Sequence, residues 1–545
     1  MLPDHPKPFY YLENFQLLLD HVASRYADLL QEAERDFLHR FPPLPQAAQA
    51  LLVRMVMRKG ELFRASKLDY SEIGPSTTAW EPLAEAGWIE LDPPLELAEL
   101  FSLLTRPELA QCCFRDQLAR SPGRKADQLA ALSEHYPQAR PLAEWGPLPD
   151  RVCRLTIQPL CDRLRLMFFG NLRQDWSEFV LADLGVFQYE KVPLSPESRG
   201  FRSRADVDCY LAIDDCRRQL DEGVPLTTLA ETARALVSDN PWLQRRRARL
   251  LFRLAQQQEQ SGQLEEALEL YRDAAYPGAR ARCVRVLERL ERTEAAHALA
   301  QLAREQPESE AERQQMRRTL PRLCRRLGLP RPEEPTLPAI PESHLTLPRP
   351  AGAVELAVRD HLHRPDAPVH YVENTLLTAL FGLLCWPALF APLPGAFFHP
   401  FHAAPADLLS PDFLERRREL FEDCLAQLND GRHRTTIREH FQAKQGIQSP
   451  FVIWPALDAE KLELALRCIA PAHLERVFRR ILDDLGANRA GLPDLIRFWP
   501  DESRYELIEV KGPGDRLQDN QIRWLHYCLE HGLPVQVCYV EWATP

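Results

Sequence analysis

The chain of 545 residues lacks the cysteine patterns of a zinc-stabilised or disulfide-bonded protein. Its 13 cysteines include one adjacent pair, Cys112-Cys113, and no C-x₂-C pair, so no zinc finger is expected. An odd number of cysteines without a disulfide-like spacing favours a reducing cytoplasm. The N-terminus has no positively charged region followed by an apolar core, and therefore no secretory signal is predicted.

Excess positive charge is also missing. The formal net charge of −11 at pH 7 argues against a uniformly basic coat for nucleic acid. A basic groove built from local clusters is still compatible with that total. Two arginine clusters on predicted helices offer basic faces, for which solvated surface and phosphate contact both stay open: Arg245, Arg246, Arg247, Arg249 and Arg253, and Arg313, Arg317, Arg318, Arg322, Arg325 and Arg326.

No uninterrupted apolar run has the length of a membrane span. The segment 374–398 carries no charge, but Pro387, Pro392 and Pro394 interrupt it. We predict a buried core helix over Tyr371–Trp386 followed by an apolar loop, and no membrane partner.

The motif that indicates chemistry lies near the C-terminus. Pro493-Asp494 is followed, fifteen residues after the aspartate, by Glu509-Val510-Lys511. Residues 495–499 and 505–511 are predicted strands, joined by a polar turn that opens with a proline. Because side chains alternate along a strand, Glu509 and Lys511 should project to the same side, and Asp494 can meet them across the hairpin.

These residue types suit metal-assisted cleavage of a phosphodiester. Two carboxylates form a hard oxygen site for Mg²⁺ or Mn²⁺, and the lysine offsets negative charge on a phosphate. This is the PD…ExK signature of metal-dependent nucleases, and a helix over 520–529 and a strand over 535–540 would complete the core. An E-x-K triplet alone is commonly a solvated face; the Pro-Asp, the hairpin and the Gly-rich loop 512–515 favour the catalytic interpretation.

The N-terminal region predicts a DNA-binding fold. Helices over 8–41, 51–57 and from Tyr70 onward, followed by a short strand near Ile89, suggest a winged helix. Two short helices near Pro107 and Lys125 resemble a SAP-type pair. The predicted phosphate contacts of the winged helix are Arg54, Arg58, Lys59, Arg64 and Lys67.

Helices and a proline-rich stretch connect this region to the motif. Residues 201–327 are helical and charge-rich, and Gly262, Ala267, Tyr271 and Ala274 keep tetratricopeptide spacing. Seven prolines over 330–350 predict a semi-rigid linker. We therefore divide the chain into 1–145 (DNA-binding), 146–329 (TPR-like), 330–350 (linker) and 351–545 (nuclease). The expected fold class is a mostly α N-terminal part followed by an α/β nuclease domain.

The C-terminal motif resembles the VRR-NUC domain of the PD-(D/E)xK superfamily and, more narrowly, the Fanconi-associated nuclease family. The resemblance rests on Gly491–Leu495 and Leu507–Leu517, and it extends to Val372-Glu373-Asn374 and to 380–386. Similar segments at 10–12, 54–70 and 201–204 carry it over nearly the full chain. The Arg-, Leu-, Ala- and Pro-rich composition indicates a bacterial member.

The resemblance implies an activity and a set of site residues. It implies cleavage of 5′-flap DNA, 5′-to-3′ exonuclease trimming and a role in interstrand crosslink repair. The expected metal ligands, for two Mg²⁺ or Mn²⁺ ions, are Asp494, Glu509, the Val510 carbonyl and, by resemblance, Glu373 on the preceding helix. Lys511 would act on the attacking water or the phosphate, Arg516 would touch a phosphate, and so would the run 416–418. Gln521 would either position the backbone at the site or cap its helix.

The same resemblance bears on partners and compartment. Branched or flapped DNA is the expected partner, and the oligomeric state is left open. Eukaryotic members carry a ubiquitin-binding zinc finger near the N-terminus; no such cysteine pattern is present, so no ubiquitin partner is expected. A bacterial member would be cytoplasmic and nucleoid-associated, and a eukaryotic one nuclear. Two alternatives stay open: a Holliday-junction or restriction-like nuclease, and a DNA-binding scaffold without catalysis.

Overall fold

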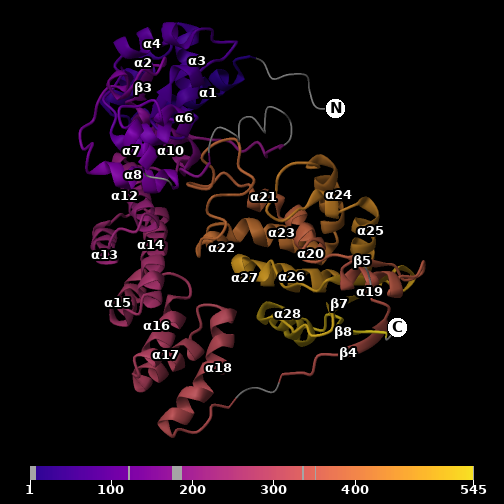
Figure 1. Ribbon diagram of the computed structural model, residues 1–545. Coiled ribbons are helices and arrows are strands. Elements are labelled where there is room, and N and C mark those ends of the chain that lie inside the picture. The colour runs from indigo at the N-terminus through magenta and orange to yellow at the C-terminus, as the bar shows by residue number, and fades with distance from the viewer. Residues whose placement is uncertain (1–7, 121–122, 175–186, 334–336, 350–351, 544–545) are drawn as a thin grey trace. The chain divides into compact units, whose positions relative to one another are not determined.

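The computed structural model describes residues 8–120, 123–174, 187–333, 337–349 and 352–543 (Figure 1). These residues form two compact units. The first comprises 1–187 and 194–207, and the second 188–193 and 208–545. The structure therefore differs from the predicted boundary at 145/146, because the segment directly after it belongs to the N-terminal unit.

The first unit opens with a winged-helix arrangement, as predicted. Its helices are α1 (Tyr10–Arg25), α2 (Glu32–Arg40), α3 (Gln46–Val56) and α4 (Ser76–Glu85). Their core is aromatic, with Phe37 stacked on Phe41 and packed against Trp88. The helix predicted from Tyr70 begins six residues later, because a turn closed by the Ile73 and Gly74 amides on the Tyr70 carbonyl precedes it.

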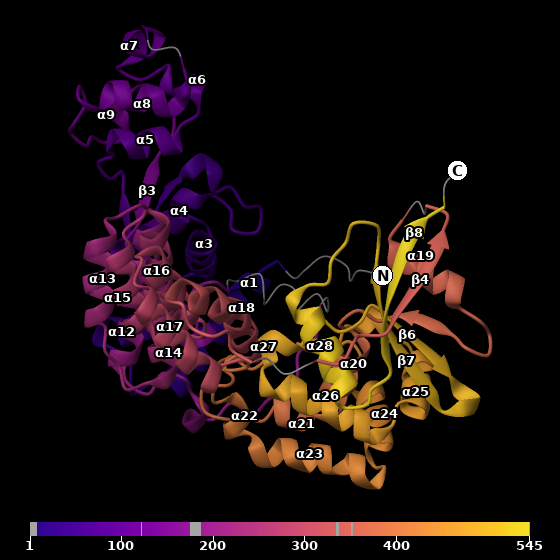
Figure 2. The same ribbon diagram turned by 90° about the horizontal axis from the view of Figure 1, so that it is seen from below.

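A three-stranded sheet completes the winged helix with a strand from far along the chain. Its order is β1 (Leu62–Arg64), β3 (Val152–Leu155), β2 (Ile89–Leu91), and both pairings are antiparallel. The SAP-type segment is thus inserted between β2 and β3. Figure 2 shows its helices gathered beyond β3: α5 (Leu97–Leu103), α6 (Arg106–Leu109), α7 (Arg115–Arg120), α8 (Lys125–Ser133) and α9 (Leu142–Trp145). α10 (Gln158–Phe169) and the 3₁₀ turn η2 (Pro196–Ser198) follow.

The second unit begins with an array of helices that pack on their neighbours in sequence. The helices are α12 (Arg204–Asp221, whose first residues belong to the first unit), α13 (Leu226–Ala235), α14 (Pro241–Gln260), α15 (Leu264–Ala274), α16 (Ala279–Arg289), α17 (Thr293–Glu305) and α18 (Glu310–Leu327). Buried alanines such as Ala267, Ala274 and Ala300 let neighbouring helices approach closely, as tetratricopeptide spacing predicts.

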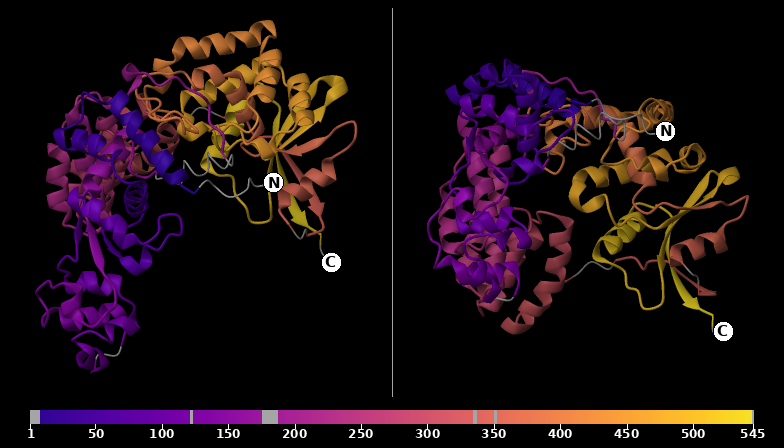
Figure 3. Two further views of the ribbon diagram at one scale, coloured as in Figure 1. Left: turned by 90° about the horizontal axis from the view of Figure 1, so that it is seen from above. Right: turned by 45° about the horizontal axis from the view of Figure 1, so that its top comes forward.

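The nuclease part is built on a five-stranded mixed sheet of order β4-β8-β7-β6-β5. The strands are β4 (Glu342–Leu347), β5 (Val369–Tyr371), β6 (Leu495–Trp499), β7 (Arg504–Lys511) and β8 (Val535–Trp542). The β6–β7 hairpin is antiparallel, and β8 runs parallel to both β7 and β4. β4 lies inside the predicted linker; Figure 3 shows it beside the yellow strand that ends the chain.

Helices cover this sheet. They are α19 (Val354–Leu362), α20 (Leu376–Leu384), α21 (Trp386–Leu389), α22 (Phe413–Arg416), α23 (Arg418–Asp430), α24 (His433–Ala443), α25 (Ala459–Cys468), α26 (Pro471–Asp483), α27 (Leu485–Asn488) and α28 (Asp519–Glu530). Every residue of α20 is buried, which confirms the predicted core helix although it is shorter than 371–386. Among the described residues, no helix combines the length and apolarity that crossing a bilayer requires.

Candidate active site

Asp494, Glu509 and Lys511 meet at the β6–β7 hairpin, as the sequence predicts. Ile508 and Val510 pack into a core cluster with Val358 of α19. Glu509 and Lys511 alternate with them, and so point to the other face. Asp494 directly precedes β6, and one of its oxygens accepts a hydrogen bond of 2.9 Å from the Val510 amide.

The Glu509 carboxylate is the most deeply buried group of the site. Its residue is 0% exposed, and Lys511 Nζ lies 2.7 Å from one of its oxygens. By distance this is an ion pair, yet neither oxygen accepts a hydrogen bond of ordinary geometry. The ion pair is attractive because charge attraction depends weakly on angle, but its geometry leaves the carboxylate under-coordinated.

Burial and neighbouring negative charges disfavour the ionised form of both acids. Burial and, next, the nearby Asp494 charge together raise the pKa of Glu509 to about 7, while Lys511 opposes the shift. Burial likewise raises the pKa of Asp494 to about 6, against the Val510 amide and Lys511. Two adjacent acids that resist ionisation are stabilised when a divalent cation replaces their protons. The residues present therefore fit a hard metal ion.

Glu373 reaches this site from a turn, whereas the sequence analysis placed it on a helix. It follows β5 and precedes α20, whose first residue is Leu376. The Glu373 side chain is exposed, and the Tyr371 hydroxyl donates a hydrogen bond to it. Its charge nevertheless raises the pKa of Asp494 and of Glu509. Within the described part of the chain, no three Asp, Glu, His or Cys side chains are grouped closely enough to hold a metal by themselves.

Backbone bonds tie the Glu373 turn to the Pro-Asp loop. The Val372 amide donates to the Asp494 carbonyl at 2.8 Å, and the Leu492 amide donates to Asn374 Oδ1 at 3.1 Å. Asn374 adopts φ = +52°, a conformation that asparagine tolerates better than most residues. Gly491 has φ = +91°, and a Cβ there would lie 2.8 Å from the Asn520 side chain. The conformations at Asn374 and Gly491 fix how closely the Pro-Asp loop approaches the Glu373 turn and α28.

Glu355 is a further acid near the site that the sequence analysis missed. It lies in the first turn of α19, and its charge raises the pKa of Asp494 and of Tyr371. A glutamate at a helix N-terminus is ordinary, so the sequence carried no signal for it. Only the packing of α19 on the sheet brings it near Asp494.

Two predicted residues lie on the segment that follows Lys511. The Gln521 side chain accepts a hydrogen bond of 2.8 Å from the Gln518 amide and so caps α28, which is one of its two predicted roles. Arg516 is exposed in the loop before α28, where a phosphate could reach it.

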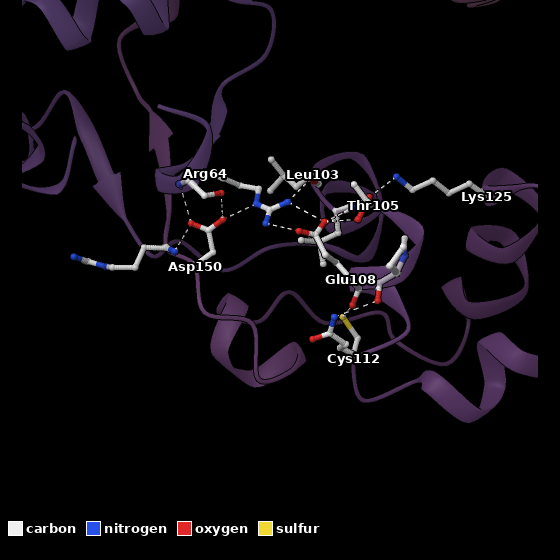
Figure 4. A network of polar contacts seen from close by, with 12 residues as sticks. Arg64, Leu103, Thr105, Glu108, Cys112, Lys125 and Asp150 are labelled. Carbon is white, nitrogen blue, oxygen red and sulfur yellow. Dashed lines mark hydrogen bonds and ion pairs between the residues drawn. The ribbon is translucent and has the colours of Figure 1, made fainter. Parts of the chain in front are cut away.

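The Arg64 guanidinium, predicted to contact a phosphate, is buried against two carboxylates. The residue is 7% exposed, and its guanidinium binds Asp150 at 2.8 Å and Glu108 at 2.6 and 3.0 Å. Figure 4 shows the guanidinium between the two carboxylates. Its donors are committed to joining β1 to the SAP-type segment and to Asp150, two residues before β3.

The other predicted N-terminal basic residues lie closer to solvent. Arg58, Lys59 and Lys67 are exposed. Arg54 pairs with Glu72 at 2.8 Å, and its guanidinium stacks 3.9 Å from the Tyr11 ring. Arg58, Lys59 and Lys67 thus remain available to a phosphate, while Arg54 would have to share its charge with Glu72.

Two residues of the arginine run 416–418, which is predicted to touch phosphates, bind a buried carboxylate. Arg417 is 1% exposed and binds both oxygens of the buried Asp407, at 2.8 and 3.0 Å. Arg416 pairs with the same carboxylate. Only Arg418 is exposed, and it pairs with Glu415.

Comparisons with known proteins agree with this architecture. Three family models match: "FAN1, HTH domain" over 9–90, "Fanconi anemia-associated nuclease SAP domain" over 94–145, and "VRR-NUC domain" over 428–542. The last includes Asp494, Glu509 and Lys511. The first two cover the winged helix up to β2 and the inserted helices.

Full-length relatives show the same similarity. A Fanconi-associated nuclease 1 homolog of Pseudomonas aeruginosa is 55% identical over 99% of this chain and 97% of its own length. A homolog of Arabidopsis thaliana is 26% identical over 99% of this chain and 68% of its own. Greater similarity to the bacterial relative is consistent with a bacterial member.

Solved structures extend the agreement to three dimensions. Crystal structures of paFAN1 bound to 5′-flap DNA with a gap superpose with a TM-score of 0.93 for the 2-nucleotide flap complex and 0.91 for the 1-nucleotide one, each at 54% identity. They cover 100% and 99% of this chain and 100% of their own chains. From its matched domains, its full-length identity and its fold, the chain belongs to the Fanconi-associated nuclease 1 family.

Proposed function

We propose that this protein is a structure-specific DNA nuclease that cuts 5′-flap DNA by divalent-metal-dependent hydrolysis. The observation that carries the proposal is the buried cluster of Asp494, Glu509 and Lys511, whose acids resist ionisation without a cation. Binding of 5′-flap DNA by the structurally similar paFAN1 supports the substrate. We extend the proposal to 5′-to-3′ trimming and interstrand crosslink repair on the basis of family membership.

The chain offers a set of oxygen ligands for Mg²⁺ or Mn²⁺. We assign Asp494, Glu509 and the Val510 carbonyl as ligands, with Glu373 joining them by exchanging its bond to Tyr371 for the metal. Two ions would match this number of carboxylates. When bound, they supply Lewis-acid stabilisation of the charge that develops on the phosphate.

The remaining chemistry belongs to the chain's own side chains. The Val510 amide fixes the orientation of Asp494. Lys511, once Glu509 is engaged by metal, carries an ammonium group that can orient the attacking water and neutralise the equatorial phosphate oxygens. Gln521 acts indirectly, by capping the helix that follows the catalytic strand.

Basic residues outside the cluster would hold the DNA backbone. We assign Arg516 to a phosphate near the cut, and Arg58, Lys59 and Lys67, with Arg54 beside them, to a duplex arm on the winged helix. Arg64 is left out of this set because its guanidinium is bound to Asp150 and Glu108.

A cleavage assay on four substrates tests the proposal. The purified protein is incubated with Mg²⁺ and a 5′ flap, a 3′ flap, a four-way junction or a blunt duplex, with EDTA as control. Much faster cutting of the 5′ flap than of the 3′ flap is expected. Equal flap rates contradict the flap assignment, preference for the junction favours a resolvase, and binding without cleavage of any substrate favours a scaffold.

A further inference from the structure

A cavity of about 270 Å³ lies between α18 of the helical array and α26 and α28 of the nuclease part. Figure 1 shows α28 between α18 and the strands β7 and β8. The volume is several times the ~30 Å³ that one water occupies in the liquid. The cavity is outside the carboxylate cluster, but α28, which lines it, begins only eight residues after Lys511, the last residue of β7.

The lining is strongly basic in a protein of net charge −11. Two glutamates, Glu310 and Glu530, face five arginines, which are Arg313, Arg317, Arg318, Arg480 and Arg523. Arg318 binds both oxygens of Asp519 at 2.8 and 2.6 Å, and Arg480 pairs with Glu310, so three acids stand against the five arginines. The cavity lining therefore keeps a net positive charge after these pairings.

Arg480 lines the cavity, and its hydrogen-bonding capacity is not fully used. It is 3% exposed, binds Glu310 at 2.7 Å and stacks 4.1 Å from the Tyr527 ring. Its Nε is buried and has no hydrogen-bond partner, and neither has the buried Nδ1 of His526 in the same lining. Burial lowers the pKa of His526, so this ring can offer a neutral donor to an anion.

The other arginines are held at positions suited to an anion. Arg523 donates to Gln314 at 2.6 Å, and burial lowers its pKa, with the Glu310 charge opposing the shift and the Arg480 charge adding to it. Like charges kept this close are stabilised by an anion between them. Arg313, one helical turn before Arg317 on α18, is exposed, and its guanidinium has no partner among the residues that the structure describes.

From this geometry we propose that the cavity binds a backbone phosphate of the DNA substrate. The inference rests on the proposed nuclease function and adds a contact outside the catalytic cluster. α28 is 12 residues long, or about 18 Å at 1.5 Å per residue. A duplex carries one phosphate per about 3.4 Å of axis on each strand, so a duplex seated at Lys511 can present a phosphate within the length of this helix.

The test uses Arg313→Ala, Arg317→Ala and the double variant, with Arg322→Ala as matched control. Arg322 lies on the same helix, outside the cavity, and is held by Glu288 at 2.8 Å. Binding of a 5′-flap DNA is measured by anisotropy in Ca²⁺ between 50 and 300 mM salt. The double variant is expected to bind several-fold more weakly at the higher salt, with a salt slope reduced by about 0.9 because one phosphate is no longer neutralised. A slope equal to that of the control overturns the proposal.

A second measurement separates DNA from a free anion. Inorganic phosphate is titrated into each protein while the melting temperature is followed. If the double variant loses stabilisation by phosphate but keeps the wild-type slope for DNA, the cavity takes free anions and the DNA assignment is overturned. Cleavage at low salt and saturating protein should persist in the double variant. Loss of cutting in Asp494→Ala tests the catalytic proposal separately.

Discussion

Arg64 and Glu509 are both buried charged residues. They differ in how completely ion pairs and hydrogen bonds compensate the charge. Arg64 meets two carboxylates, and the pKa of Glu108 is lowered to about 2, mainly by its bond to Arg64. Around Glu509 the pKa is raised to about 7, and no donor of good geometry approaches. A satisfied buried charge specifies shape, whereas an unsatisfied one indicates a missing ligand.

Removing the catalytic charges should give the largest effect. Asp494→Ala and Lys511→Ala are each expected to lower single-turnover cleavage of a 5′ flap by about 10³-fold or more, because each removes charge stabilisation available in the transition state. DNA affinity should stay near wild type. Arg504→Ala, on the exposed end of the same strand, is the matched control. Wild-type-like cutting by either variant would contradict the catalytic assignment of that residue.

Arg64→Ala should act on stability instead. It leaves Asp150 and Glu108 without their shared partner, at a cost of about 3 kcal/mol in the free energy of unfolding. The control Arg40→Ala breaks an exposed pair with Asp36 and should change little. Denaturant unfolding monitors both. The pKa of Glu108 is depressed below its ordinary 4.5, so its stabilising effect is present above that pH and is lost as pH falls toward 2. If Arg64→Ala unfolds at the same denaturant concentration as wild type, the ion pairs of Arg64 do not stabilise the fold, and the contrast with the unsatisfied Glu509 is lost.

Neutralising Asp494 should stabilise the metal-free protein. Its folded-state pKa of about 6 exceeds the ordinary 3.8, so the folded chain binds more protons between these values and the free energy of unfolding falls as pH rises through them. At pH 8 in EDTA, Asp494→Asn should exceed wild type by about 2–3 kcal/mol, with no difference near pH 3. Mg²⁺ should then stabilise wild type more than the variant. If the variant has wild-type stability at both pH values and responds equally to Mg²⁺, then ionised Asp494 does not destabilise the metal-free protein.

The smallest effect should come from Asn374. Asn374→Gly keeps the positive φ but loses the acceptor for the Leu492 amide, and we expect about 10-fold slower cleavage, or ~1.4 kcal/mol, without loss of stability. Asn374→Ala should add a stability loss of about 1 kcal/mol because alanine is strained at this φ. Single-turnover rates and thermal melts of both variants distinguish positioning from folding. Equal rates in wild type and the glycine variant would mean that the bond does not position the site.

The sequence was most informative where the structure is local. Asp494, Glu509 and Lys511 share one hairpin, so alternation along the strand was enough to bring them together. Arg64 was misread because its partners Glu108 and Asp150 lie 44 and 86 residues away. An arginine in a basic stretch looks the same in sequence whether those carboxylates reach it or not.

Elements that form only by contact with distant segments likewise could not be predicted from the sequence. β4 is short and flanked by Pro341 and Pro348, which are typical of a linker, and only its pairing with β8 makes it a strand. Glu355 and the turn position of Glu373 required the packing of α19 and α20 to be known. β3 lies after the predicted boundary at 145/146, yet it pairs with strands that precede the SAP-type segment, and this pairing could not be predicted from the sequence.

That arrangement of β3 sets a constraint on how the N-terminal unit is made. β1 and β2 pair with β3 and not with each other, so a chain ending at residue 91 would carry both strands without a partner. During synthesis the winged helix cannot close its sheet until the inserted helices have left the ribosome. Truncations designed on the boundaries of the separate family models should therefore aggregate through these open edges, and the shortest fragment expected to fold must reach past Leu155.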